Sequence, residues 1–150
     1  LEWYVARELR RWLGFDVATG VKFHARGVGG DLDLVAAGEG KLIYVELKSS
    51  PPKHLSNGEI SAFFDRVRLV RPDLALFVID TALRLSDKVV PMLTDELARR
   101  SDAVPEPSRV ERELWTLGRH LYIVNSRTDL MTNIGRAIAE GLLSQHPPLV

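Results

Sequence analysis

Two acidic residues and a lysine in the first third of the chain have the types and spacing of a hydrolytic metal site. Asp33 is followed by Glu46-Leu47-Lys48. Carboxylate oxygens, with water and a backbone carbonyl, are the ligands that Mg²⁺ and Mn²⁺ prefer. A neighbouring lysine can orient an attacking water or stabilise charge that develops on a phosphate. These residue types therefore predict metal-dependent hydrolysis of a phosphate ester, provided that the fold brings them together.

The segment 30–50 is predicted to be a β-hairpin that brings them together. Leu32 and Leu34 are expected on one side of its first strand, because aspartates alternate with them. Gly38-Glu39-Gly40 supplies the turn, since glycine tolerates the positive φ that hairpin loops need. The return strand is expected over residues 41–48.

This hairpin is expected to gather the charged side chains on one face. Glu46 and Lys48 are two residues apart on a strand, so their side chains leave the same face about 7 Å apart. Asp33 lies on the neighbouring strand and comes close to Glu46 when the turn closes. Two carboxylates this close repel each other unless a cation lies between them. The structural alternative is that these charges merely form the solvated face of an antiparallel sheet.

A third carboxylate is predicted to come from a helix over residues 2–13, which ends before a glycine. Its apolar face is expected to comprise Val5, Leu9, Trp12 and Leu13. Glu2 projects near the middle of that face, and Glu8 lies at its edge. A carboxylate directed at the core is costly unless it is paired or metal-bound. Glu2 is therefore the candidate and Glu8 the second choice, while a terminal residue in water is the alternative for Glu2.

Taken together, these residues resemble the D…ExK signature of the PD-(D/E)XK, or restriction-endonuclease-like, nuclease superfamily. The sequences GDLDLVA and IYVELKSS are similar to the G-E/D-x-D-hydrophobic-hydrophobic-A…VEVK variant of that signature. This variant is found in small archaeal and bacterial nucleases related to Holliday-junction resolvases and Mrr-type restriction enzymes. Leu32 stands where many members have proline. The resemblance covers residues 2–79.

The resemblance implies an α/β fold with an αβββαβ core, in which helices flank a central mixed sheet. It implies that Asp33 and Glu46 hold Mg²⁺ or Mn²⁺, with the backbone carbonyl of Leu47 as a further ligand. Glu2 would complete the metal shell, and Lys48 would orient or activate the water. The implied protein is an endonuclease that hydrolyses phosphodiester bonds in DNA, for repair, recombination or restriction, and the absence of cysteine fits a cytoplasmic location. The alternative is a catalytically inactive domain of this fold that binds nucleic acid or a protein.

The rest of the chain is expected to continue in the same α/β manner. A first strand is predicted over 15–25, a helix over 56–70 behind a capping box, a covered strand over 74–79, a helix over 86–100, a strand over 120–125 and a last helix from 128. Residues 110–117 have only weak helical spacing. Arg66, Arg68 and Arg71 are basic enough to contact a nucleic-acid backbone, although a solvated helix face explains them equally well. The chain, 1–150, is expected to be one domain with its core at about 2–80 and additional α/β elements at 81–145.

Composition limits the classes of protein that this chain can represent. Of its 150 residues, 45% are hydrophobic and 27% are charged, which is typical of a soluble globular domain. No apolar run approaches the roughly 20 residues of a membrane span, so no membrane partner is expected. The absence of cysteine excludes disulfides and thiolate metal sites. The formal net charge of zero lacks the basic excess that nucleic-acid binding favours. Duplex cleavage would suit a homodimer, and a targeting domain would lie outside this chain.

Overall fold

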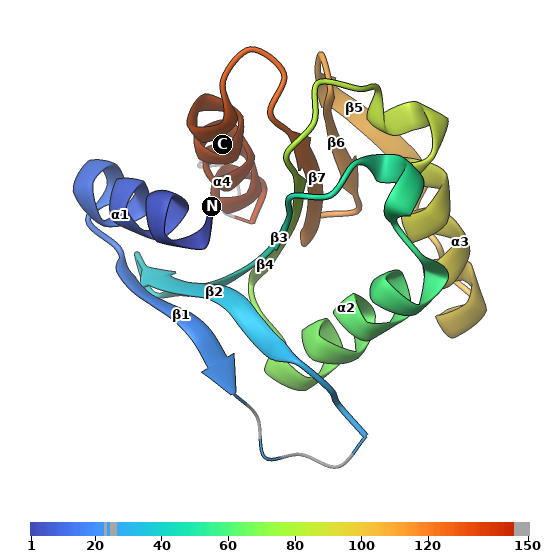
Figure 1. Ribbon diagram of the computed structural model, residues 1–150, viewed down its shortest axis with the longest axis horizontal. Helices are drawn as coiled ribbons and strands as arrows, with labels where there is room; N and C mark the ends of the chain where they lie inside the picture. The colour runs from blue at the N-terminus through green and yellow to red at the C-terminus, as the bar shows by residue number, and fades with distance from the viewer. Residues whose placement is uncertain (23, 25–26, 146–150) are drawn as a thin grey trace, which may run out of the picture.

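The computed structural model describes residues 1–22, 24 and 27–145, and seven strands form one sheet in the order β1-β2-β3-β4-β7-β6-β5 (Figure 1). The helices are α1 (Glu2–Leu13), α2 (Asn57–Val70), α3 (Val89–Arg100) and α4 (Leu130–Ser144), and short 3-10 turns cover Pro52–His54 and Leu85–Asp87. The strands are β1 (Asp16–Lys22), β2 (Asp31–Gly38), β3 (Lys41–Lys48), β4 (Leu74–Ile79), β5 (Pro107–Glu111), β6 (Leu114–Leu117) and β7 (Leu121–Asn125).

The sheet is mixed, which confirms the predicted α/β class. β1, β2 and β3 pair in antiparallel fashion, and β3, β4 and β7 are parallel. β6 pairs antiparallel to β7, and β5 pairs antiparallel to β6. From α1 to β4 the order is helix, three strands, helix and strand. The crossover through α2 lets β3 and β4 pair in parallel, because parallel strands need a long connection rather than a tight turn. Residues 81–145 add the neighbour of β4, so the second half of the chain completes the same sheet.

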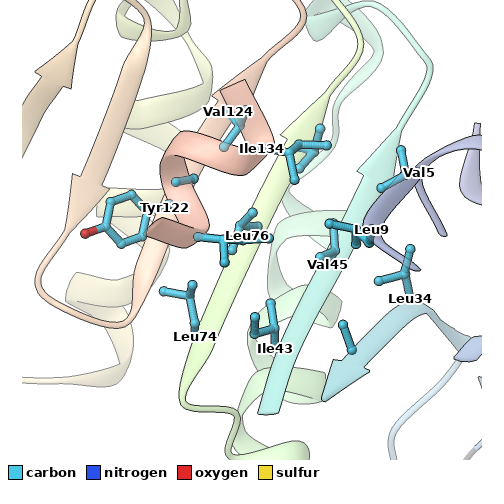
Figure 2. Close-up of a cluster of buried hydrophobic side chains, with 14 of the residues drawn as sticks. Val5, Leu9, Leu34, Ile43, Val45, Leu74, Leu76, Tyr122, Val124 and Ile134 are labelled. Carbon is cyan, nitrogen blue, oxygen red and sulfur yellow. The ribbon is translucent and has the colours of Figure 1, made fainter. Parts of the chain in front are cut away.

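Helices cover both faces of this sheet (Figure 1). β4 is buried along its whole length, because alternate residues enter two separate cores. Leu74, Leu76 and Val78 join the core beneath α1 and α4, which Figure 2 shows. Ala75, Phe77 and Ile79 join the core beneath α2 and α3. Burying each large apolar side chain contributes about 1.5–3 kcal/mol, which explains why this strand is a continuous apolar run.

The predicted apolar face of α1 is only partly right. Val5 and Leu9 are fully buried, but Trp12 is 70% exposed and Leu13 is exposed as well, whereas Glu8 is buried. The helix begins near the centre of the molecule and its last turn lies at the periphery (Figure 1). The last turn therefore extends past the core, so apolar spacing does not lead to burial there. Gly14 ends the helix with a φ of 65°, a conformation that glycine adopts readily.

The boundaries of other elements differ from prediction in smaller ways. β1 begins at Asp16, and Phe23 and Ala25, at the end of the predicted strand, lie outside the described residues. The capping box before α2 is confirmed: Ser56 Oγ accepts the Glu59 N–H, and the Glu59 carboxylate accepts the Ser56 N–H. Residues 110–117, whose spacing is weakly helical, belong to the β5–β6 hairpin instead. Pairing with β7 outweighs a weak local preference.

Strand β2 changes faces at Asp33, and this change positions the site. Leu32 packs in the core beneath α2, whereas Leu34 packs in the core beneath α1. Residues two apart in a regular strand share a face, so the expectation that these leucines lie on one side is wrong. The pairing of β1 with β2 leaves Gly20 opposite Asp33, and Gly20 has a φ of 57°. The irregular backbone of Gly20 coincides with this change of face, which places Asp33 at the boundary between the two faces.

Replacing Gly141 with alanine is expected to destabilise the protein by roughly 1–3 kcal/mol. A Cβ at Gly141 would lie 2.5 Å from Cδ1 of Leu74, where α4 crosses β4. Gly135 in the same helix is the matched control, because a Cβ there meets nothing within 4 Å. Alanine at Gly135 should stabilise α4 by up to about 1 kcal/mol through helix propensity. Urea denaturation would measure both, and equal stability of the two variants would contradict the close packing of α4 on β4.

Candidate active site

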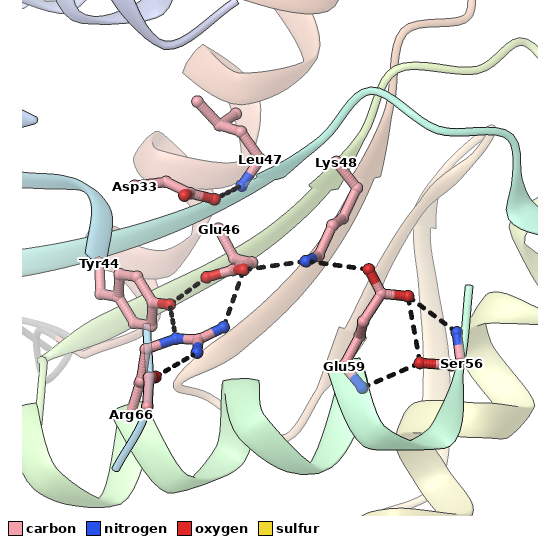
Figure 3. Close-up of polar contacts among 9 residues, drawn as sticks. Asp33, Tyr44, Glu46, Leu47, Lys48, Ser56, Glu59 and Arg66 are labelled. Carbon is pink, nitrogen blue, oxygen red and sulfur yellow. Dashed lines mark hydrogen bonds and ion pairs between the residues drawn. The ribbon is translucent and has the colours of Figure 1, made fainter. Parts of the chain in front are cut away.

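Asp33, Glu46 and Lys48 lie where the β2–β3 ladder ends, and the side chains of Glu46 and Lys48 point toward α2 (Figure 3). The last printed pair of that ladder is Leu34 with Val45, so continuing the register by one residue sets Asp33 across from Glu46. The hairpin prediction for these residues is therefore correct in its strand pairing. Neighbouring antiparallel strands hold opposite residues about 4.5–5.5 Å apart at Cα. The two carboxylates thus come from adjacent strands at one end of the sheet.

Asp33 takes the place of a backbone partner of β3. Its Oδ2 accepts a hydrogen bond of 2.8 Å from the Leu47 N–H. The pKa of Asp33 is raised to about 6, chiefly by burial and to a smaller extent by the carboxylates of Glu46 and Glu2, while the Leu47 N–H and Lys48 act against this rise. Glu46 and Glu2 are therefore close enough to Asp33 for their charges to disfavour its ionisation.

The carboxylate of Glu46 is buried, with only 2% of the residue exposed. Its Oε1 lies 3.0 Å from Nη2 of Arg66 and 3.3 Å from Nζ of Lys48. Its Oε2 accepts a hydrogen bond from the Tyr44 hydroxyl. A buried charge of this kind is tolerated only when it is paired and hydrogen-bonded. Glu46 meets both conditions through side chains of the protein itself.

Arg66 is the residue whose role sequence reasoning missed. It is 6% exposed and does not belong to a solvated helix face. Its Nη2 donates to Glu46, its Nε donates to the Tyr44 hydroxyl at 3.1 Å, and its Nη1 donates to the Gly29 carbonyl at 3.0 Å. One sequence signal could have found it, because Arg66 follows the buried Phe63 by one helical turn. Arg66 links α2 to both the site and the loop that precedes β2.

Lys48 is held between two carboxylates. Its Nζ lies 3.3 Å from Oε1 of Glu46 and 3.5 Å from Oε1 of Glu59. Glu59 is also the capping-box residue of α2, and its Oε2 accepts the Ser56 N–H at 2.9 Å. That backbone hydrogen bond, with a smaller contribution from Lys48, lowers the pKa of Glu59. The start of α2 thereby helps to hold the Lys48 ammonium group beside Glu46.

The two candidate glutamates of α1 have different surroundings. Glu2 is exposed rather than directed into the core, so that expectation fails, but its charge is close enough to raise the pKa of Asp33. Glu8 is buried, and its Oε1 lies 3.0 Å from Nη2 of Arg7, while its Oε2 accepts a hydrogen bond from Trp12. These contacts hold its pKa below the usual value. Glu2 is therefore the first-helix carboxylate whose charge acts on Asp33, and Glu8 contacts side chains of its own helix.

The donor set fits a hard cation in type, but it is not arranged as a finished metal site. Within residues 1–22, 24 and 27–145, no three His, Cys, Asp or Glu side chains lie close enough together to hold a metal ion. The Lys48 carbonyl accepts the Asp80 N–H on the β4 side. Successive residues of a strand alternate in direction, so the Leu47 carbonyl faces β2, where Asp33 lies. For Glu46 to bind a cation together with Asp33 and this carbonyl, the Glu46 carboxylate would have to release Arg66 or Lys48.

Asp33→Asn is expected to stabilise the protein above pH 6. An acid whose pKa rises on folding is destabilising while it is ionised, and the cost disappears as the pH falls through about 6 and then through 3.8. The full rise would correspond to about 3 kcal/mol, and solvent screening at this half-buried site reduces the expectation to about 1–2 kcal/mol. Asparagine can still accept the Leu47 N–H.

Denaturation of both proteins in urea at pH 8 and at pH 4 would check this expectation. The difference between variant and wild type should be present at pH 8 and should shrink at pH 4, where the wild-type carboxyl is largely protonated in the folded protein. A variant that is less stable than wild type at pH 8 would show that keeping Asp33 ionised does not destabilise the folded protein.

Comparison of the chain with protein-family models, with curated proteins and with solved structures finds no match. In the part of the chain that the structure describes, none of the helices combines the length and apolar character needed to cross a membrane. The fold and the site thus define an α/β protein with paired carboxylates and a lysine at the end of a hairpin, and its function rests on that geometry.

Proposed function

We propose that this protein is a metal-dependent nuclease of the restriction-endonuclease-like type, hydrolysing phosphodiester bonds in DNA. The observation that carries the proposal is the pair of carboxylates on adjacent strands, Asp33 and Glu46, with the Lys48 ammonium 3.3 Å from Glu46. The order of elements from α1 to β4 agrees with the αβββαβ core that the sequence resemblance implies. The pKa of Asp33, raised chiefly by burial and further by Glu46 and Glu2, supports the proposal, because acids with perturbed pKa values cluster at functional sites.

Each residue has a role in this proposal that follows from its surroundings. Asp33, Glu46 and the Leu47 carbonyl would hold Mg²⁺ or Mn²⁺, and Glu2 would complete the shell from α1. The bound metal would stabilise negative charge on the phosphate and the departing oxygen. Lys48, held by Glu46 and Glu59, would orient the attacking water and stabilise charge on the phosphate. The cytoplasmic location and a homodimer for duplex cleavage remain parts of the proposal.

One observation favours a second candidate function, that of a catalytically inactive domain that binds nucleic acid or a protein. Arg66 neutralises Glu46 without any metal, at 3.0 Å from its Oε1. A permanent ion pair of this kind would leave Asp33 and Glu2, without Glu46, as the acids available to a cation. Titration with Mg²⁺ in a calorimeter separates the two candidates, because an inactive domain should show no binding that depends on Asp33.

The decisive experiment is incubation of the protein with plasmid, single-stranded, flapped and four-way DNA. Parallel reactions contain Mg²⁺, Mn²⁺ or EDTA. Cleavage of at least one substrate with metal, and of none with EDTA, is the expected result. If no substrate is cut and calorimetry detects no Mg²⁺ binding, the nuclease proposal fails and the inactive domain is favoured.

A further inference from the structure

The outer surface of α1 carries aromatic rings and guanidinium groups that the core does not use. This surface, called here the α1 face, comprises Trp3, Tyr4, Arg7, Arg11 and Trp12. Trp3 is 69% exposed and Trp12 is 70% exposed. Large indole rings this open to water are unusual on a small globular protein and commonly mark a binding surface.

The rings of the α1 face are already paired with cations. The guanidinium carbon of Arg7 lies 4.8 Å from the ring centroid of Trp3 and 5.5 Å from that of Tyr4. The guanidinium carbon of Arg11 lies 5.5 Å from the ring of Trp12. Beneath them, Glu8 accepts hydrogen bonds from both Arg7 and Trp12. These contacts restrict the rotamers of the side chains before any ligand binds, which lowers the entropic cost of binding.

The two indoles lie where a nucleic-acid strand that crosses α1 could contact both. With a rise of about 1.5 Å and a rotation of about 100° per residue, Trp3 and Trp12 are separated by about 13 Å along the helix axis and by about half a turn around it. A strand that contacts both rings must therefore cross the outer surface of α1, where Arg7 and Arg11 lie. A groove of about 390 Å³ lies beside Trp12 between α1 and α4, lined in part by Tyr4, Trp12 and Met131. Proteins that bind single strands combine aromatic stacking platforms with cations along the backbone, and the smallest sites span about four nucleotides.

We propose that the α1 face binds single-stranded nucleic acid, with bases stacked on Trp3 and Trp12 and phosphates at Arg7 and Arg11. A single strand is favoured over a duplex, because the open indoles need base faces that a duplex keeps stacked inside. Glu2 precedes Trp3 on the same helix and lies near Asp33, so a bound strand would lead toward the candidate active site. That last step rests on the proposed nuclease function, whereas binding of the strand does not.

The proposal also accounts for a chain with no net charge. Binding that depends mainly on stacking needs few cations, so its dependence on salt should be weak. With two phosphates neutralised on a single strand, the logarithm of the binding constant should fall with the logarithm of salt concentration with a slope of about −1.4.

Fluorescence anisotropy of a labelled oligothymidylate, measured in EDTA so that no cleavage occurs, tests the proposal. A Trp3→Ala/Trp12→Ala variant is expected to bind at least about tenfold more weakly than wild type, since stacking on each ring contributes substantially. Trp3→Phe, which keeps a ring, should retain most of the affinity. Leu143→Ala is the matched control, because Leu143 is 71% exposed but lies on α4. Far-UV circular dichroism would establish that each variant is folded.

The outcomes separate this proposal from the nuclease proposal. Binding of the oligonucleotide that requires the indoles supports the α1 face, even if no DNA is cut when Mg²⁺ is added. Equal affinity of wild type and the double alanine variant overturns it, even if cleavage is observed. Equal affinity for single-stranded and duplex DNA also overturns it. A dimer of the wild type that the double variant loses, without any oligonucleotide binding, would show that the surface contacts a second copy instead.

Discussion

Asp33→Asn is expected to lower the rate of Mg²⁺-dependent DNA cleavage by at least about a thousandfold while the chain remains folded. The change removes a carboxylate from the proposed metal site but keeps an acceptor for the Leu47 N–H, which Asp33 Oδ2 now binds at 2.8 Å. A catalytic metal supplies several kcal/mol of transition-state stabilisation, and about 1.4 kcal/mol corresponds to a factor of ten in rate. Cleavage of a fluorescent DNA substrate, followed over time with saturating Mg²⁺, measures the loss.

Asp31→Asn is the matched control for this loss, because Asp31 is an exposed aspartate two residues earlier on the same strand. It should cut DNA at close to the wild-type rate. Equal rates for the two variants would remove Asp33 from the site. Glu46→Gln is preferable to alanine as a companion variant, because alanine would leave the buried guanidinium of Arg66 without its anion.

Arg66→Ala is expected to lower the free energy of unfolding by about 3–5 kcal/mol, the usual cost of breaking a buried ion pair by removing one partner. Glu46 would keep Lys48 but lose the Arg66 contact at 3.0 Å. The Tyr44 hydroxyl and the Gly29 carbonyl would each lose a hydrogen bond. Denaturation in urea, followed by circular dichroism in EDTA, measures the change.

Arg68→Ala provides the control, since Arg68 is exposed on the same helix and should alter stability by less than about 0.5 kcal/mol. If Glu46 binds Mg²⁺, saturating Mg²⁺ should stabilise Arg66→Ala more than wild type, because the metal no longer competes with Arg66 for the carboxylate. Should Arg66→Ala prove as stable as Arg68→Ala, the network around Glu46 would have no structural role.

Local sequence patterns were sufficient to predict the elements that hold the site. Alternation and a glycine turn predicted the hairpin, and the capping box at Ser56 predicted the start of α2. The register of the hairpin then set Asp33 across from Glu46. These features depend on residues that are near in sequence or on one tight turn, so they can be inferred without knowledge of the tertiary structure.

The contact between Arg66 and Glu46 depends on long-range packing and could not be inferred in the same way. Arg66 is 20 positions from Glu46 and contacts it only because α2 packs over β3, whereas Tyr44 lies two residues before Glu46 on the same strand. Likewise, the prediction that Leu32 and Leu34 share a face assumed a regular strand. In the structure β2 changes faces between them, beside Gly20, and they enter different cores. Trp12 has the spacing of a core residue, but the sheet does not extend far enough beneath the end of α1 to cover it.

The central position of β4 has a consequence for biosynthesis. Leu74–Ile79 is an uncharged, fully apolar strand whose far edge is covered by β7, Leu121–Asn125. While the ribosome is still making the intervening residues, that edge has no partner, and an apolar strand with an open edge is a template for aggregation. A nascent chain halted before Leu121 should therefore engage chaperones or precipitate, even though every residue of the candidate site has already been synthesised.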